Sequence, residues 1–171
     1  SSTNSSETKN ETWNDNPWYS VFEKQRKNRQ QICNRAVRQR IFKLSELEKT
    51  LHKYRTDFRQ ALFNDFRKPA HETDITEIYP VLHEIRVAKS LAFFGTSSKI
   101  IRTAKGNCLI IAPWNYPLLL TFGPLVSAIA AGNTVILKPS EFTPHTSSVM
   151  KKIIAELFQE DEVAIIEGGK E

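Results

Sequence analysis

Residues 108–137, CLIIAPWNYPLLLTFGPLVSAIAAGNTVIL, contain the pattern that decides the fold. CLIIA is a short unbroken apolar run, typical of a strand that is buried on both faces. Residues 117–131 have helical spacing and are followed by Gly132-Asn133, which is a common helix end. Residues 134–137 form a second short apolar run. The stretch therefore predicts a strand, a helix and a second strand in succession.

The same alternation is repeated once toward the C-terminal end. Residues 144–158 predict an amphipathic helix with Thr143 as its N-cap, and residues 163–166 predict a third strand. Strands that alternate with helices form parallel sheets with right-handed crossovers. We therefore expect an α/β protein in which residues 96–171 hold the first half of a Rossmann-like sheet. Three strands leave an exposed edge, so we expect this chain to be part of a longer one.

The residues before the sheet predict a helical layer. Apolar residues recur every three or four positions, which favours one helix over residues 21–43 and a second over residues 45–67. Ser45-Glu46-Leu47-Glu48 has the form of a capping box and would begin the second helix. A third helix over residues 75–94 contains Pro80, where we expect a kink or a helix start near residue 79.

The remaining segments connect these parts. Residues 1–20 are polar and predict a flexible tail, and residues 21–95 would then form the helical layer that packs on the sheet. Residues 99–103 and 107–112 predict two strands around a turn at Lys105-Gly106.

Composition argues against several classes of protein. No stretch reaches the roughly 18 apolar residues of a membrane helix, and no signal-peptide pattern is present, so we expect a cytoplasmic protein with no membrane segment. The formal net charge is +5, and residues 21–60 carry a net +8. These charges interleave with an apolar stripe, and no aromatic platform lies among them. This pattern favours a solvated helix face over a nucleic-acid surface. Cys33 and Cys108 are expected to be reduced, and the scattered histidines predict no metal site.

Polar segments follow all three predicted strands. APWN, residues 112–115, follows the first strand, KPSE, residues 138–141, follows the second, and EGG, residues 167–169, follows the third. Ligands of open parallel sheets bind beyond the carboxyl ends of the strands, so we expect these segments to share one ligand site. The sequence contains neither GxGxxG nor GxxxxGK, so a nucleotide here is not held by the usual glycine-rich phosphate loop.

Asn115 has two possible roles at this edge. Its carboxamide could donate a hydrogen bond to negative charge that develops on a carbonyl oxygen. Pro113 and Pro117 restrict the backbone on either side of it. Alternatively, Asn115 caps the helix that begins at Pro117, and spacing alone slightly favours the cap.

Lys138 and Glu141 also allow two interpretations. A lysine and a glutamate three residues apart at a strand end could bind neighbouring hydroxyl groups, as on a ribose, and the carboxylate would repel a 2′-phosphate. Alternatively, the two side chains form an exposed ion pair worth under about 1 kcal/mol. The residues themselves favour neither interpretation.

IIAPWNYPLLL, followed by AIAAGNTVILKPSE, resembles the aldehyde dehydrogenase superfamily. NYP, IYPVLHEI and IIEGG are similar to its class 3 branch, which includes fatty and coniferyl aldehyde dehydrogenases. The resemblance covers roughly residues 20–171 and implies the N-terminal portion of the aldehyde dehydrogenase fold. It also implies oxidation of aldehydes to carboxylic acids, with NAD as the expected cofactor, NADP as the alternative, and a homodimeric full-length protein.

The resemblance assigns roles to particular residues. Asn115 would be the asparagine that stabilises the oxyanion, and residues 96–171 would be the first part of an NAD(P)-binding domain. The implied cofactor-binding residues are Ile111, Ala112, Pro113, Trp114, Lys138, Glu141 and Gly169.

The same resemblance implies that other parts are missing. The family's nucleophilic cysteine and general-base glutamate lie beyond Glu171, and neither Cys33 nor Cys108 matches that cysteine. We therefore expect the 171 residues alone to be inactive. The alternative is a non-catalytic nucleotide-binding or protein-interaction module derived from the same family.

Overall fold

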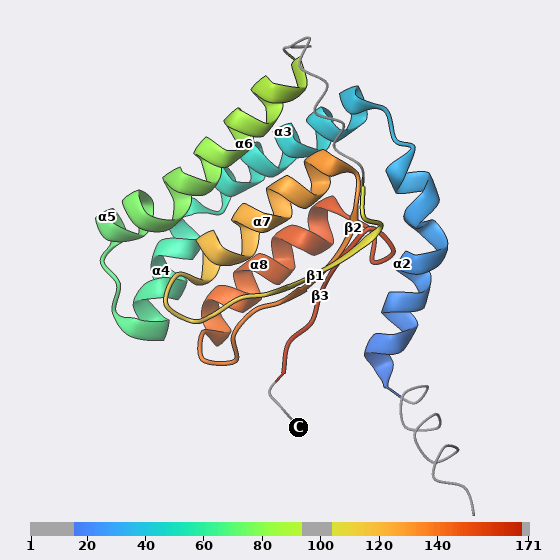
Figure 1. Cartoon of the computed structure of the whole chain (residues 1–171). Helices are drawn as coiled ribbons and strands as arrows, with labels where there is room; N and C mark the ends of the chain where they lie inside the picture. The colour runs from blue at the N-terminus through green and yellow to red at the C-terminus, as the bar shows by residue number, and fades with distance from the viewer. Residues whose placement is uncertain (1–15, 94–103, 169–171) are drawn as a thin grey trace, which may run out of the picture.

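The computed structural model describes residues 16–93 and 104–168 (Figure 1). Its N-terminal helices are α2 (Pro17–Cys33), α3 (Val37–Lys53), α4 (Arg55–Phe66), the short α5 (Ala70–Thr73), the π-helical turn η1 (Asp74–Ile78) and α6 (Tyr79–Phe93). The sheet portion consists of β1 (Asn107–Ile111), α7 (Pro117–Ala131), β2 (Thr134–Lys138), α8 (Pro144–Leu157) and β3 (Val163–Ile165). Residues 1–15, the strand predicted over 99–103, Gly95 and Gly169 lie outside the described residues.

The three described strands form one parallel sheet in the order β1-β2-β3. Asn107 lies opposite Thr134 in the first pair of strands, and Val135 lies opposite Val163 in the second. The helices α7 and α8 connect the strands in turn, which confirms the predicted α/β alternation. Parallel pairing also brings all three carboxyl ends to one edge of the sheet.

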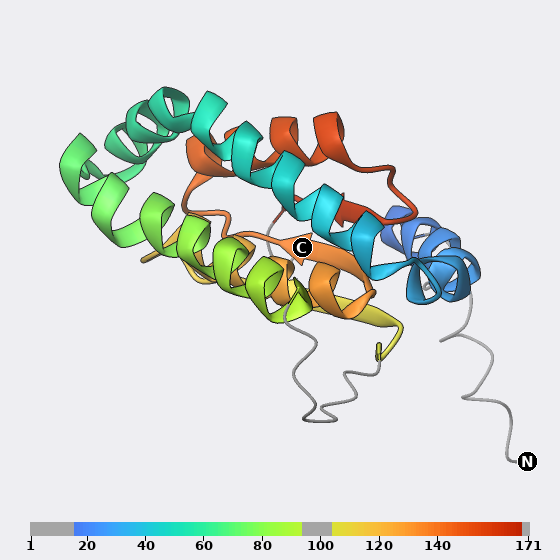
Figure 2. The ribbon, with the colours of Figure 1, turned by 90° about the horizontal axis from the view of Figure 1, so that it is seen from above.

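Helices cover both faces of the sheet, but unequally. The helices α7 and α8 lie on one face, and α3, α4 and α6 pack against them as a further layer (Figures 1 and 2). The other face contacts α2, whose Val21 packs on Ile136 and Ala164. The main core lies between the sheet and the helical layer, and its largest fully buried side chains include Leu47, Phe58, Phe122, Leu125 and Leu137.

The strand CLIIA is not buried on both faces, contrary to expectation. In β1, the side chains of Leu109 and Ile111 are 63% and 71% exposed. The helix α2 covers its face of the sheet chiefly over β2. The prediction holds for β2, where residues 134–137 are all buried.

The helix boundaries also differ from those predicted. The first break falls at residues 34–36, and the capping-box sequence from Ser45 lies inside α3. A second break falls at Tyr54, between α3 and α4. The apolar stripe runs from Val37 to Leu62 and continues through the break at Tyr54 with unchanged spacing, so periodicity could not locate that break. Residues 23–31 are all polar, so no stripe marks the first break. Pro80 is the second residue of α6, which continues directly from η1, so the helix start expected near residue 79 is the junction between the π-helical and the α-helical segment.

Candidate functional site

The carboxyl edge of the sheet brings the three predicted segments together. The Ala112 N–H donates to the Lys138 carbonyl at 3.0 Å, and the Ile166 N–H donates to the Leu137 carbonyl at 2.8 Å. These hydrogen bonds extend the ladders just past β1 and β3. The segments that follow the three strands therefore begin side by side, as their shared edge predicts.

Asn115 lies in the exposed segment between β1 and α7. Trp114, Asn115 and Tyr116 are all exposed, and Tyr116 occupies the N-cap position of α7 without a side-chain cap hydrogen bond. Within the described part of the chain, no hydrogen bond to the Asn115 side chain is found. The interpretation of Asn115 as the helix cap is therefore wrong, and its carboxamide is available to a ligand.

The cap of α7 comes instead from a distant buried carboxylate. Glu77 Oε2 accepts hydrogen bonds from the Leu118 N–H at 3.1 Å and the Leu119 N–H at 3.0 Å. Glu77 Oε1 contacts Lys68 Nζ at 2.5 Å. Burial raises the pKa of the Glu77 carboxyl group above its ordinary value, and the Lys68 ammonium and the two backbone amides oppose that rise.

A cavity of about 270 Å³ lies beside Asn115. It is bounded on one side by Asn115 and Tyr116, and on the other by residues 66–69 and Glu72. Lys68 Nζ lies 4.5 Å from the centroid of the Tyr116 ring. Asn115, the candidate oxyanion donor, thus borders a cavity that is lined by both apolar and charged side chains.

Lys138 and Glu141 do come together after β2. Lys138 Nζ lies 3.7 Å from Glu141 Oε2 and donates to the Pro139 carbonyl at 3.0 Å. The Glu141 side chain is 42% exposed. The pair is therefore loosely associated and accessible to a ligand.

A second hollow, of about 160 Å³, opens next to this pair at the first turn of α8. Its walls include Ser140, Glu141, Ser147, Glu167 and Gly168, so it joins the ends of β2 and β3. Gly168 has a φ of 133°, and a side chain at that position would meet open space. A ligand can therefore approach the backbone closely here.

The first turn of α8 has a partner that the sequence did not reveal. Thr143 is the N-cap residue but makes no side-chain cap hydrogen bond. The fully buried carboxylate of Asp65 accepts from the His145 and Thr146 N–H groups instead. No local pattern around Asp65 identifies it as a cap, because its partners lie on another helix.

The predicted cofactor-groove residues differ in exposure. Ile111 and Trp114 are 71% and 56% exposed, Pro113 is exposed, and Ala112 is 5% exposed. Ala112 can therefore contribute only its backbone.

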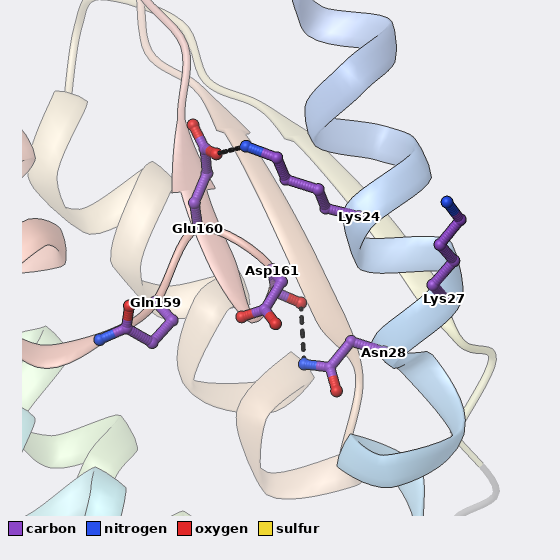
Figure 3. Close-up of a pocket in the computed structure, with 6 residues that line it drawn as sticks. All are labelled: Lys24, Lys27, Asn28, Gln159, Glu160 and Asp161. Carbon is purple, nitrogen blue, oxygen red and sulfur yellow. Dashed lines mark hydrogen bonds and ion pairs between the residues drawn. The ribbon is translucent and has the colours of Figure 1, made fainter.

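A hollow of about 610 Å³ lies at the opposite edge of the sheet, between α2 and the residues that lead into β3 (Figure 3). Lys24 Nζ pairs with Glu160 at 2.6 Å, and Asn28 donates to the Asp161 carbonyl at 3.3 Å. Lys24 and Asn28 thus already bind other residues of the hollow. Its position at the amino ends of the strands is also unlike that of ligand sites in parallel sheets.

Neither a metal centre nor a membrane span is found in the described residues. They contain no group of three or more His, Cys, Asp or Glu side chains that could hold an ion. None of the described helices is long and apolar enough to cross a bilayer.

Residues 17–171 match the model of the aldehyde dehydrogenase family. The 4,4'-diaponeurosporen-aldehyde dehydrogenase of Staphylococcus aureus is 41% identical over 142 residues, which are 75% of this chain and 31% of that protein. A probable coniferyl aldehyde dehydrogenase of Pseudomonas aeruginosa is 38% identical over 76% of this chain and 30% of its own length. The chain thus spans about a third of each relative, and the coniferyl enzyme agrees with the predicted class 3 resemblance.

A solved structure supports the same fold. The substrate-bound state of Staphylococcus aureus AldH superposes with a TM-score of 0.81 at 35% identity. The match covers 90% of this chain and 37% of that one. The helical layer and the small parallel sheet are therefore arranged as in that protein.

Proposed function

The chain belongs to the aldehyde dehydrogenase family, and from this premise we propose that it supplies an oxyanion-binding asparagine and part of a nicotinamide-cofactor cleft to an enzyme that oxidises aldehydes to carboxylic acids. The observation that supports this most directly is the state of Asn115. Its carboxamide is exposed at the carboxyl end of β1, while Glu77 satisfies the amides at the start of α7.

Asn115 would act when a thiolate adds to the aldehyde carbonyl. The new sulfur–carbon bond displaces the carbonyl π electrons onto oxygen, and the Asn115 NH₂ group would donate a hydrogen bond to that oxyanion. A nicotinamide bound at this edge of the sheet would supply the hydride acceptor for oxidation of the adduct to a thioester, and water would then release the acid from the thioester. By family resemblance, the thiolate and the general base come from outside residues 1–171.

The hollow at Ser140, Glu141 and Gly168 would receive the adenosine end of a dinucleotide. Lys138 and Glu141 would bind the ribose hydroxyl groups, and Gly169 would lie next to the adenine and its phosphates. Ile111, Pro113 and Trp114 would line the groove with their exposed surfaces, and Ala112 with its backbone. The Glu141 carboxylate would repel a 2′-phosphate, so we propose NAD in preference to NADP.

Three further points belong to this proposal. A polypeptide limited to residues 1–171 would not oxidise aldehydes, because it would contribute Asn115 without the nucleophile. The complete protein would be a cytoplasmic homodimer. It would bind an aldehyde and no nucleic acid.

The test uses the protein at the full length that its coding sequence specifies. Asn115→Ala should lower kcat about 100-fold or more, as loss of an oxyanion donor does. Asn64→Ala is the control, because Asn64 is exposed on α4 and bonds only the Gln60 side chain among described groups. An unchanged kcat in Asn115→Ala, with the chemical step shown to limit the rate, would contradict the assignment.

A further inference from the structure

Two charged side chains are buried directly behind the Asn115 segment. The side chain of Lys68 is 4% exposed, and that of Glu77 is 0% exposed. One carboxylate oxygen of Glu77 contacts the Lys68 ammonium, and the other accepts from both free amides of the α7 first turn. A single carboxylate therefore links Lys68 to the backbone that follows Asn115.

Lys68 also contacts the Asn115 segment directly, through the ring of Tyr116. Its ammonium lies 4.5 Å from the centroid of the Tyr116 ring and 5.0 Å from that of the Phe66 ring. Tyr116 is the residue next to Asn115, and Glu77 holds the helix that begins one residue later. The Lys68–Glu77 pair therefore constrains both the side chain and the backbone on the C-terminal side of Asn115.

Glu77 lies in an unusual turn, the π-helical segment η1. The first residue of that segment, Asp74, accepts hydrogen bonds from the guanidinium groups of Arg55 and Arg59 on α4. A π-helical turn shifts the register of the side chains that follow, and such turns often occur at functional sites. Burying a charged pair is also a poor way to gain stability, because desolvation offsets the attraction.

We propose that Glu77 is a positioning residue for the oxyanion site: its carboxylate oxygen caps the start of α7, so that the Asn115 carboxamide is held at the carboxyl end of β1. The inference rests on the proposed role of Asn115. An oxyanion donor must lie within hydrogen-bonding distance of the developing charge, and a misplacement of about 1 Å can cost about 100-fold in rate.

Two conservative variants separate positioning from charge balance. In Glu77→Gln one side-chain oxygen remains, and one oxygen is all that Leu118 and Leu119 use, although the charge opposite Lys68 is lost. In Glu77→Asp the charge remains, but the shorter side chain withdraws from those amides. Positioning predicts that Glu77→Asp lowers kcat about tenfold or more and that Glu77→Gln stays within about threefold of wild type, both with little change in the KM for NAD.

The activity assay uses the protein at its full coded length, with Asp74→Asn as the matched control. Asp74 lies in the same π-helical turn and is 7% exposed, but its hydrogen bonds go to Arg55 and Arg59 and not to α7. Asp74→Asn should lose stability and keep its kcat within about twofold. Equal losses in the two Glu77 variants, or a larger loss in Glu77→Gln, would overturn the proposal.

Amide exchange gives a readout that does not depend on activity. In the folded protein, hydrogen exchange at Leu118 and Leu119 should be faster in Glu77→Asp than in Glu77→Gln, and unchanged in Asp74→Asn. If Asn115→Ala leaves kcat unaffected, the proposed function itself fails. If Asn115→Ala is impaired while Glu77→Asp has wild-type kcat and exchange, only the positioning role is excluded.

Discussion

Asp65, near the end of α4, joins its helix to Thr146 in the first turn of α8. Asp65 Oδ2 accepts from the Thr146 N–H at 2.8 Å and from the Thr146 hydroxyl group at 2.7 Å. Asp65 Oδ1 accepts from the His145 N–H at 3.1 Å. A carboxylate from the helical layer thus supplies the cap that Thr143 does not, directly after the KPSE segment.

Asp65→Ala should destabilise the protein by about 2–3 kcal/mol. The substitution removes a helix cap and leaves amide and hydroxyl donors without partners in a buried place. Urea unfolding followed by circular dichroism measures the loss. Asp57→Ala is the matched control, since Asp57 is exposed on the same helix and should cost less than about 0.5 kcal/mol. Equal losses in the two variants would show that Asp65 is not an effective cap.

The cluster of Asp74 with Arg55 and Arg59 predicts a defined pH dependence. The two guanidinium groups hold the pKa of the Asp74 carboxyl group well below its usual range. A carboxyl group with a lowered folded-state pKa contributes stability above its unfolded pKa of about 3.9, and this contribution is lost as the pH falls toward the folded-state pKa.

Asp74→Asn should therefore reduce the free energy of unfolding by about 1–3 kcal/mol at neutral pH. The difference from wild type should begin to shrink below about pH 4. Urea unfolding of both proteins from pH 3 to pH 7 measures it. A difference that stays constant over this range would mean that Asp74 contributes through packing and not through its charge.

Much of the fold followed from local patterns, and the errors have a common cause. The apolar runs of β1 and β2 look alike, yet β2 is buried and Ile111 of β1 is exposed, because burial depends on which elements cover a strand. The helical stripe from Val37 to Leu62 likewise passes through the break at Tyr54 without a change of period. Local composition predicts the kind of element better than its environment or its exact ends.

The candidate site, too, could be predicted from the sequence only in part. Topology placed the segments after β1 and β2 at one edge, since parallel strands end together. Glu77 and Asp65 could not be found this way, because their carboxylates cap helices 41 and 81 residues further along the chain. The one local signal for Glu77 is an acidic residue beside the fully buried Ile78. Whether Asn115 caps α7 likewise depended on this distant carboxylate, which accepts from the amides of that helix instead.

The proposed ribose contact predicts a change in cofactor preference. In the protein at full coded length, Glu141→Ala should raise the KM for NAD about tenfold, because a hydrogen bond to a charged group is lost. The KM for NADP should rise less, or fall, because the repulsion of the 2′-phosphate is removed as well. Glu160→Ala, at the opposite edge of the sheet, is the control. Parallel changes in both KM values would exclude Glu141 from discriminating between the cofactors.

The last prediction concerns residues 1–171 expressed as a separate polypeptide. It should form no NADH from NAD and an aldehyde, because the only cysteines in these residues are unsuited to act as the nucleophile. Burial raises the pKa of the Cys108 thiol, and Cys108 lies within β1, opposite Val135. Cys33 lies at the end of α2, on a different element from the Asn115 segment. A thiol with a raised pKa is mostly protonated at neutral pH and is a weak nucleophile.

The same polypeptide should bind NAD weakly or undetectably in a calorimetric titration, because the proposed contacts include only the adenosine end and one wall of the groove. Cys108→Ala should change neither the weak binding of NAD nor the absence of NADH formation. Aldehyde-dependent NADH formation that disappears in Cys108→Ala would contradict the assignment of the nucleophile to another segment. A dissociation constant in the low-micromolar range would show that the hollow at Glu141 and Gly168 holds the dinucleotide by itself.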